Sequence, residues 1–427
     1  VRGTSTGFEV LYGNITPNAP GADYASWSFR KAPGFFDVVA YTGNGSSTGD
    51  SQTISHGLGS TPGFVMIKRT SGTGEWVCWH RSISTGQPRK YIQLNATNGT
   101  GSMGADIWGT VNSTGLEVKH NGTVGDSYEI NKNGETYVAY FFAHDSQTFG
   151  TDEDESIIKC GSISGYNARA ELGFEPQFVL LKMTNYASNW ILLDVMRGWH
   201  SGLNNDAHLF ANLTATEADY DGPSFDATGF NYGQSGEDWI YMAIRRPHKP
   251  PTVGTEVFKA TLQSSSSSFD VGFPTDMVIS SYTGSGNKYL SARLTNASLL
   301  TDGNVAETTQ TQQYFLFDLQ NSYQYGAWLG NTEVISYNFK RAPGFFDAVA
   351  YSGNNVATNQ NHNLGVPPEL IITKVRSGPY NRDWNVGPFV TGYSDGYLNL
   401  NNSNAGFGNV STYFPGTPTS AIYGLPG

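Results

Sequence analysis

The sequence predicts an all-β protein, a tandem array of β-sandwich-like modules of about 90–115 residues that together form an elongated fibre. Strand-length runs rich in Val, Ile, Tyr, Phe and Trp alternate with clusters of Gly, Asn, Ser and Asp, and no long stretch has helical spacing. Glycine contributes 51 of 427 residues and charged residues only 14%, which is typical of turn-rich β proteins. Aromatic residues, at 13%, are frequent enough to build cores.

A ten-residue phrase occurs twice. Residues 30–39 read RKAPGFFDVV, and residues 340–349 read KRAPGFFDAV. The match extends on both sides, since residues 26–29 (SWSF) correspond to residues 336–339 (SYNF). A match of this length indicates duplicated units, and such arrays usually serve as scaffolds or binding surfaces.

A second phrase recurs four times and sets the size of the unit. Each copy places a proline just before a strand-length apolar run, and the spacings between the four prolines are 114, 98 and 94 residues. Each unit therefore has the size of a small domain. The aligned prolines are Pro62, Pro176, Pro274 and Pro368.

Two further features fall into register with the prolines. Three units carry a tryptophan in the next predicted strand, at Trp76, Trp190 and Trp384, and we interpret these rings as core residues. Each unit then closes on an aromatic-rich run, and residues 25–33 read as the closing run of an earlier unit. The chain therefore reads as a segment of a longer polypeptide. We predict the end of a preceding module at 1–33, β modules at 34–149, 150–253 and 254–343, and a fourth, truncated module at 344–427.

The joints between modules are predicted near residues 33, 146–155, 247–253 and 343, where proline and polar residues interrupt a strand ladder. In both copies of the long phrase, a Phe-Phe pair follows Ala-Pro-Gly at the joint. We expect at least one ring of each pair to be buried, because it would tie a closing strand to the next opening strand. The pairs are Phe35 with Phe36 and Phe345 with Phe346.

Charge and cysteine usage exclude several classes of partner. The net charge of −11 argues against nucleic acid and anionic membranes. No apolar run reaches 18 residues, so no transmembrane helix is predicted. Cys78 and Cys160 lie at different positions of the repeat, and we predict two buried free thiols.

The chain is poor in groups that could form a catalytic centre, and we predict a non-enzyme without cofactor or metal. His56 and His362 recur in the pattern His-x-Leu-Gly, and we expect turn residues that form hydrogen bonds, with a ligand contact as the alternative. The acidic run 152–155 near His144 reads as a solvated linker or, alternatively, a loose cation site. Five carboxylates lie close together in sequence, and we expect turn-forming roles for them, with a hydrolytic pair as the alternative: Asp219, Asp221, Asp226, Glu237 and Asp238.

Aromatic residues in predicted loops are the candidates for contact with a glycan, because apolar sugar faces stack on exposed rings. These candidates are Trp108, Trp199, Tyr393 and Tyr397.

The recurring phrases resemble repeat modules of structural proteins of marine phages, including phages of cyanobacteria. The resemblance rests on residues 26–39, 56–69, 137–145 and 239–247, and it covers nearly the whole chain. It brings no catalytic residues. It implies an extracellular, non-enzymatic virion appendage, a tail-fibre segment that supports attachment to the host.

The resemblance also implies partners: other virion tail proteins, a host surface glycan and further copies of the chain in a homotrimer. The alternative is a bacterial cell-surface or secreted adhesin built from carbohydrate-binding β modules. A polysaccharide depolymerase spike is disfavoured, because a repeat of about 100 residues with hairpin turns does not suit a long parallel β-helix.

Overall fold

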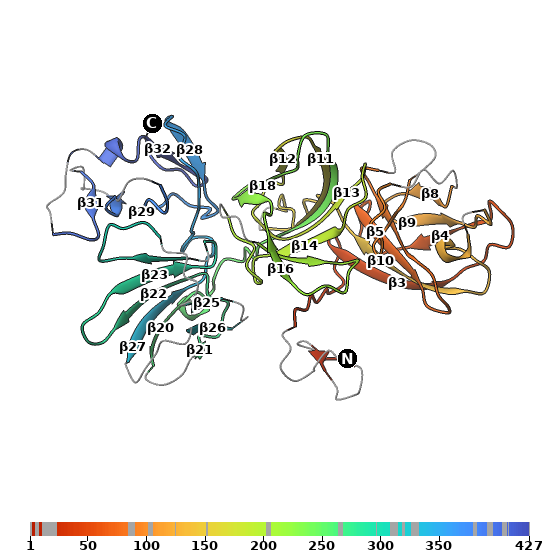
Figure 1. The fold of residues 1–427 in the computed structure, drawn as a ribbon, viewed down its shortest axis with the longest axis horizontal. Coiled ribbons are helices and arrows are strands. Elements are labelled where there is room, and N and C mark those ends of the chain that lie inside the picture. The colour runs from red at the N-terminus through yellow and green to blue at the C-terminus, as the bar shows by residue number, and fades with distance from the viewer. Residues whose placement is uncertain are drawn as a thin grey trace. The chain divides into compact units, whose positions relative to one another are not determined.

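The computed structural model is all-β, with short antiparallel sheets and only single-turn 3-10 helices in the described residues (Figure 1). The chain folds into two compact units: residues 1–94 with 100–160, and residues 95–99 with 161–427. No helix in the described part of the chain is long and apolar enough to cross a bilayer. The structure describes all residues except 1, 5–7, 11–23, 84–89, 101–105, 124, 151–152, 202–205, 264–267, 296, 308–314, 318–320, 326–332, 379–381, 391–395, 404–407, 409 and 427.

The first unit contains one five-stranded and one three-stranded antiparallel sheet. In the run Thr136–Phe142, buried side chains alternate with less buried ones as far as Phe141, which follows the two-residue period of a strand. A short hairpin of β1 (Arg2–Gly3) and β2 (Phe8–Glu9) precedes them, and no strand is assigned to residues 24–31. The large sheet has the order β3 (Phe36–Thr42), β10 (Thr136–Phe142), β5 (Phe64–Arg69), β6 (Trp76–His80) and β7 (Ile92–Gln93); the small sheet has the order β4 (Ser51–Ser55), β9 (Gly115–Lys119) and β8 (Trp108–Val111).

The second unit begins with a similar pair of sheets. Side chains from both sheets, including Phe230 of the small one and Val179 of the large one, share a single core. The large sheet has the order β11 (Ile158–Ser164), β19 (Asp238–Arg245), β13 (Pro176–Met183), β14 (Trp190–Asp194), β15 (Asp206–Phe210) and β16 (Ala218–Tyr220); the small sheet has the order β12 (Ala168–Glu171), β18 (Gly229–Tyr232) and β17 (Ser224–Asp226).

Two further groups of sheets follow in the second unit. Residues 258–339 form a sheet of β20 (Phe258–Gln263), β27 (Val334–Phe339), β22 (Met277–Tyr282), β23 (Lys288–Ala292) and β24 (Ala297–Leu300), and a sheet of β21 (Ser268–Asp270), β26 (Ser322–Tyr325) and β25 (Phe315–Leu316). Residues 358–425 form a sheet of β29 (Leu370–Thr373), β30 (Asn385–Pro388) and β31 (Leu398–Asn399), and a pair of β28 (Thr358–Asn361) and β32 (Ile422–Leu425).

The three large sheets share one strand order. We call the last strand of each large sheet in sequence its closing strand, and the strand at the repeated proline its proline strand. In each large sheet, the closing strand lies between the first strand and the proline strand. The closing strands are β10, β19 and β27, and the proline strands are β5, β13 and β22, with β29 as the counterpart in the fourth set. The glycine that precedes each proline strand has φ between +69° and +85°, a conformation that favours glycine.

Both cysteines are buried free thiols, as predicted. Burial raises the pKa of each thiol, so neither is poised as a thiolate nucleophile.

Candidate functional site: the repeated joint

The turn at Ala-Pro-Gly has the same backbone hydrogen bonds in both copies of the long phrase. In the first copy, the amide of Ala32 donates to the carbonyl of Phe36 at 2.9 Å, and the amide of Gly34 donates to the carbonyl of Leu58 at 2.7 Å. Gly34 adopts φ of +70°, which a residue with a Cβ enters only with strain. The second copy has the Ala342–Phe346 bond at 3.0 Å, the Gly344–Leu364 bond at 2.7 Å and φ of +70° at Gly344.

His56 holds the neighbouring turn through hydrogen bonds, as predicted. Its Nδ1 accepts the amide of Leu58 at 3.4 Å, so its Nε2 carries the proton and donates to the carbonyl of Asn112 at 3.2 Å. Burial lowers the pKa of this imidazole and keeps it neutral, as one acceptor and one donor require. His362 makes the same contacts with the amide of Leu364 at 3.2 Å and the carbonyl of Thr419 at 3.1 Å.

An acidic residue after the Phe-Phe pair completes the joint. Asp37 accepts the amide of Gly57 at 2.6 Å and binds Lys31 Nζ at 3.1 Å. Burial alone would raise the pKa of Asp37, but the amide of Gly57 and the ammonium of Lys31 hold it below its usual value. In the second copy, Asp347 accepts the amide of Asn363 at 2.8 Å and lies 3.8 Å from Arg341.

The second copy of the joint sits in a group of buried charges. Both carboxylate oxygens of Glu175 lie within 2.9 Å of Arg341, whose side chain is only 2% exposed. Carboxylate oxygens of Asp347 and Asp276 lie 3.8 and 4.0 Å from the same guanidinium. Burial alone would lower the pKa of Arg341, but these three carboxylates raise it above the usual value.

Two further arginines balance the charge. Arg246 lies 3.4 Å from Glu175 and 3.4 Å from Asp347, and Arg293 lies 3.6 Å from Asp276. Buried ion pairs recover their desolvation cost only with good geometry, but removing one partner leaves an uncompensated buried charge. We call this group the buried charge cluster: Glu175, Arg246, Asp276, Arg293, Arg341 and Asp347.

The residues of the cluster lie at the ends of strands that are far apart in sequence. Glu175 directly precedes β13, Arg246 directly follows β19, and Arg341 and Asp347 flank the Ala-Pro-Gly turn after β27. The cluster therefore fixes how these three segments of the second unit meet.

A lysine at the end of the proline strand repeats in three sets of sheets. Lys182 is fully buried, and burial lowers its pKa to about 8. Its ammonium also donates to the carbonyl of Thr97 at 2.8 Å, in the segment that folds with the second unit, and Lys374 donates likewise to Asn304 at 2.9 Å. Each lysine donates to a carbonyl in the turn that follows it: Lys68 to Gly74, Lys182 to Ser188 and Lys374 to Arg382.

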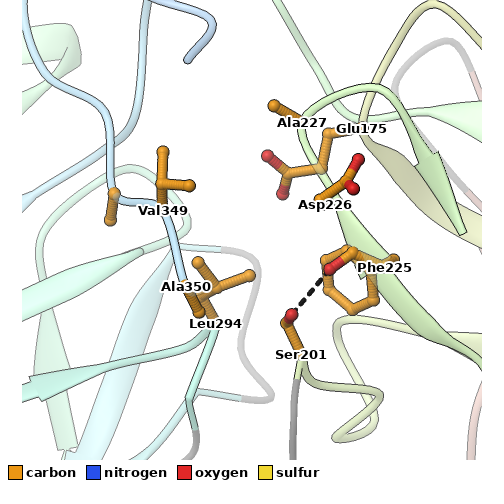
Figure 2. Close-up of a pocket in the computed structure, with 9 residues that line it drawn as sticks. Glu175, Ser201, Phe225, Asp226, Ala227, Leu294, Val349 and Ala350 are labelled. Atoms are coloured by element: carbon orange, nitrogen blue, oxygen red, sulfur yellow. Dashed lines mark hydrogen bonds between the residues drawn. The ribbon is translucent and has the colours of Figure 1, made fainter. Parts of the chain in front are cut away.

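A small cavity lies beside the charge cluster (Figure 2). Glu175 and Asp226 approach it from one side and Leu294, Val349 and Ala350 from the other. Its interior has room for about one water molecule, so this cavity suits a solvent molecule rather than an organic substrate.

The repeated tryptophans are held in matching ways. The amide of Trp190 donates to Asn212 Oδ1 at 2.8 Å, and the amide of Trp384 donates to Asn401 Oδ1 at 3.0 Å. Both rings are buried, whereas Trp76 is half-buried beside Tyr140. Of the repeated prolines, Pro62 and Pro176 are buried, and Pro274 and Pro368 are half-buried.

The Phe-Phe expectation holds for the first pair and is wrong for the second. Phe36 is buried, and its ring centroid lies 5.0 Å from that of Phe142 in the closing strand. Phe35 is half-buried. Phe346 is only half-buried and Phe345 is 41% exposed. Phe345 and Phe346 pack on Phe339 of the preceding strand. Phe36 is covered by the neighbouring strand β10, whereas no strand in the described residues lies beside Phe346 in the same way.

Two candidate glycan contacts were wrong. Trp108 and Trp199 are each 0% exposed, so no sugar can stack on them. Trp199 packs on Phe225 at 4.5 Å and donates Nε1–H to the carbonyl of Pro223 at 2.8 Å. Tyr397 is half-buried against Tyr413, and Tyr393 lies outside the described residues.

The candidate carboxylates include several with structural partners. Asp226 binds the Arg169 guanidinium at 2.9 and 2.8 Å, Glu237 accepts from the Trp239 indole and Asp238 accepts from the Ser164 hydroxyl. Asp219 and Asp221 are exposed. Near the acidic connector, Asp145 pairs with Lys159 at 3.3 Å. In the described residues, no group of three or more potential metal ligands occurs.

Asp206 is a buried acidic residue that no motif or repeat in the sequence marked as a candidate. It is 1% exposed, lies 3.1 Å from His200 Nδ1 and accepts the amides of His200 and Gly222 at 3.0 Å. Burial raises its pKa to about 7 and lowers that of His200.

The fold is all-β and built from several small antiparallel sheets, three of which share one strand order. Residues 3–247 match a family described as a domain of unknown function, DUF7483, and the chain belongs to this family. No curated protein and no solved structure matches the chain at a significant level.

Proposed function

We propose that the chain is a structural, non-enzymatic segment of a virion appendage, a phage tail fibre that supports attachment to the host cell. The observation that carries the proposal is the recurrence of one joint at two places 310 residues apart in the sequence, Lys31 to Asp37 and Arg341 to Asp347. The same turn, the same histidine contacts and the same carboxylate position recur there. Recurrence of connections, rather than of reactive groups, favours a mechanical role.

The chemistry of the joint supports this role. Each joint fixes the path from one strand set to the next by backbone hydrogen bonds and by a buried carboxylate, Asp37 or Asp347. Such contacts limit bending where successive modules meet, which a shaft requires. Charged residues make up only 14% of the chain, so surface electrostatics contribute little that salt could screen.

The proposed partners follow from this role. They are further copies of the chain, other tail proteins and a glycan on the host surface. Exposed aromatic rings such as Tyr166 and Tyr186, at 74% and 62% exposure, are better placed for a sugar than the buried tryptophans.

Immunogold labelling tests the proposal. Antibodies raised against the purified chain are applied to virus particles and to host cells from the same culture. We expect gold along filaments that project from the particle. Gold confined to uninfected cell surfaces would refute the tail-fibre function and favour the adhesin.

A further inference from the structure

Two tyrosines of the second unit are the most exposed large hydrophobic side chains among the described residues. Tyr166 is 74% exposed and Tyr186 is 62% exposed. Single exposed hydrophobic residues are common on protein surfaces, whereas several that gather at one place mark an interaction site. The positions of the two rings in the fold therefore decide what they are for.

Both rings lie in turns at the same end of the six-stranded sheet. β11 ends two residues before Tyr166, and β13 ends three residues before Tyr186. β19 lies between these two strands and begins at this end. Neighbouring strands lie about 4.8 Å apart, so the ends of β11 and β13 are roughly 10 Å apart. This spacing suits a ligand longer than a single sugar ring.

Hydrogen bonds to the start of β19 hold both turns in place. The amide of Gly165 donates to the carbonyl of Glu237 at 2.9 Å. On the other side, Asn185 Oδ1 accepts the amide of Asp238 at 3.1 Å, and its Nδ2 donates to the carbonyl of Gly236 at 2.7 Å. A surface that is ordered before binding loses little conformational entropy when a ligand binds.

A carboxylate lies between the strands that lead to the two rings. Asp238, the first residue of β19, is exposed, and its Oδ1 accepts the Ser164 hydroxyl at 2.6 Å. A carboxylate has about four acceptor sites, so Asp238 can also accept from the hydroxyls of a ligand. The three turns, 165–167, 184–189 and 233–237, contain no lysine or arginine. The surface therefore suits a hydroxyl-rich ligand without negative charge.

The corresponding turns of the first unit contain no aromatic residue. They are residues 43–50, which follow β3, and residues 70–75, which follow β5. β3 and β5 flank the closing strand β10 as β11 and β13 flank β19. The repeated fold therefore does not require rings at these turns, and Tyr166 and Tyr186 are specific to this module.

We propose that Tyr166, Tyr186 and Asp238 form a binding site for an uncharged oligosaccharide. The two rings stack on the apolar faces of sugars, and Asp238 accepts hydrogen bonds from sugar hydroxyls. Tyrosine suits this role because it offers a large, rigid and amphipathic contact surface at a low cost in conformational entropy. This inference deepens the proposed attachment function and rests on its glycan partner.

A printed array of uncharged and acidic oligosaccharides tests the class of ligand. The labelled, purified chain is applied to the array, and bound glycans are then tested in competition with their constituent monosaccharides. We expect binding to uncharged glycans, and competition by the monosaccharide at least about tenfold weaker, because one sugar covers only one ring. Binding to acidic glycans alone, or to no glycan, would overturn the proposal.

Variants of the two tyrosines test the position of the site. Tyr166→Ala and Tyr186→Ala should each weaken binding about tenfold or more, whereas Tyr166→Phe keeps the ring and should bind nearly as the unmodified chain does. The urea midpoints of these variants should not change, since both rings are exposed.

Tyr220→Ala is the matched control. Tyr220 is 50% exposed and lies in β16, the strand at the opposite edge of the same sheet, so its removal should leave binding unchanged. If Tyr166→Ala and Tyr186→Ala bind as the unmodified chain does, the site is wrong. That result leaves the immunogold test of the fibre function unaffected, so the two proposals fail separately.

Discussion

Replacing Arg341 by methionine tests whether the buried charge cluster holds the second unit together. Arg341→Met keeps most of the side-chain volume but removes the cation that lies within 4.0 Å of Glu175, Asp276 and Asp347. Arg246 and Arg293 remain, so three buried carboxylates would face two guanidinium groups. Breaking a buried pair by removing one partner costs about 3–5 kcal/mol. We expect the free energy of unfolding of the second unit to fall by about that amount.

Lys31→Met is the matched control. Lys31 occupies the equivalent position of the repeat and binds Asp37 at 3.1 Å, but its side chain is 60% exposed. Asp37 is itself buried but keeps the amides of Gly57 and Val38, and the ammonium of Lys31 lies largely in solvent, so the control should cost only roughly 1 kcal/mol.

Urea unfolding followed by tryptophan fluorescence measures both variants. Trp79 and Trp108 are buried in the first unit, which contains Lys31, and Trp190, Trp199 and Trp384 are buried in the second unit, so fluorescence reports on the unfolding of both. We reason that the buried charge cluster stabilises the second unit because it is buried. A fall in the free energy of unfolding of less than about 1 kcal/mol for Arg341→Met, or a fall equal to that of Lys31→Met, would refute this.

Three further outcomes are expected. Gly34→Ala should destabilise the protein more than Gly344→Ala. Both glycines have φ of +70°, but a Cβ at Gly34 would lie 2.4 Å from Thr148 Oγ1, whereas a Cβ at Gly344 would meet no atom within 4 Å. Equal shifts of the urea midpoint in the two variants would contradict this. Burial raises the pKa of Asp206 to about 7, so its carboxyl contributes fully to stability below about pH 4, and this contribution is lost as the pH rises through 7. Asp206→Asn should therefore flatten the dependence of the free energy of unfolding on pH. Parallel stability profiles of the variant and the unmodified chain in urea would contradict this. Light scattering of the purified chain should give the mass of a homotrimer, and a monomer mass at micromolar concentration would contradict it.

The repeat was visible in the sequence because it is local. The proline strands, the closing strands β10, β19 and β27, and the turn at His56 all follow from short phrases that recur in register. The hydrogen-bonding role of His56 was predictable because the same pattern appears again at His362. Each of these features is marked by a short phrase that recurs, even where its partner is distant in sequence, as Asn112 is from His56.

The buried charge cluster was not predictable in the same way. Glu175 meets Arg341 across 166 residues, and Thr61 occupies the equivalent position of the first unit, so no repetition marks the pair. Trp199 was misjudged because a loop position suggested exposure, whereas the ring packs inward on Phe225. Phe345 was misjudged because the identity of the two phrases implied identical neighbours.

The central place of the closing strand has a consequence for synthesis on the ribosome. Thr136 pairs with Thr42, so β3 gains its sheet neighbour only after the whole intervening segment has emerged. Contacts of such separation in sequence form slowly, and an incomplete sheet exposes strand edges in the meantime. The Phe-Phe-Asp end of the second joint, at residues 345–347, is translated directly after the closing strand β27, so completion of that sheet comes just before the next set of strands begins. Folding along the chain should therefore advance in steps of one module, and pauses in translation just after a closing strand would protect the nascent chain best.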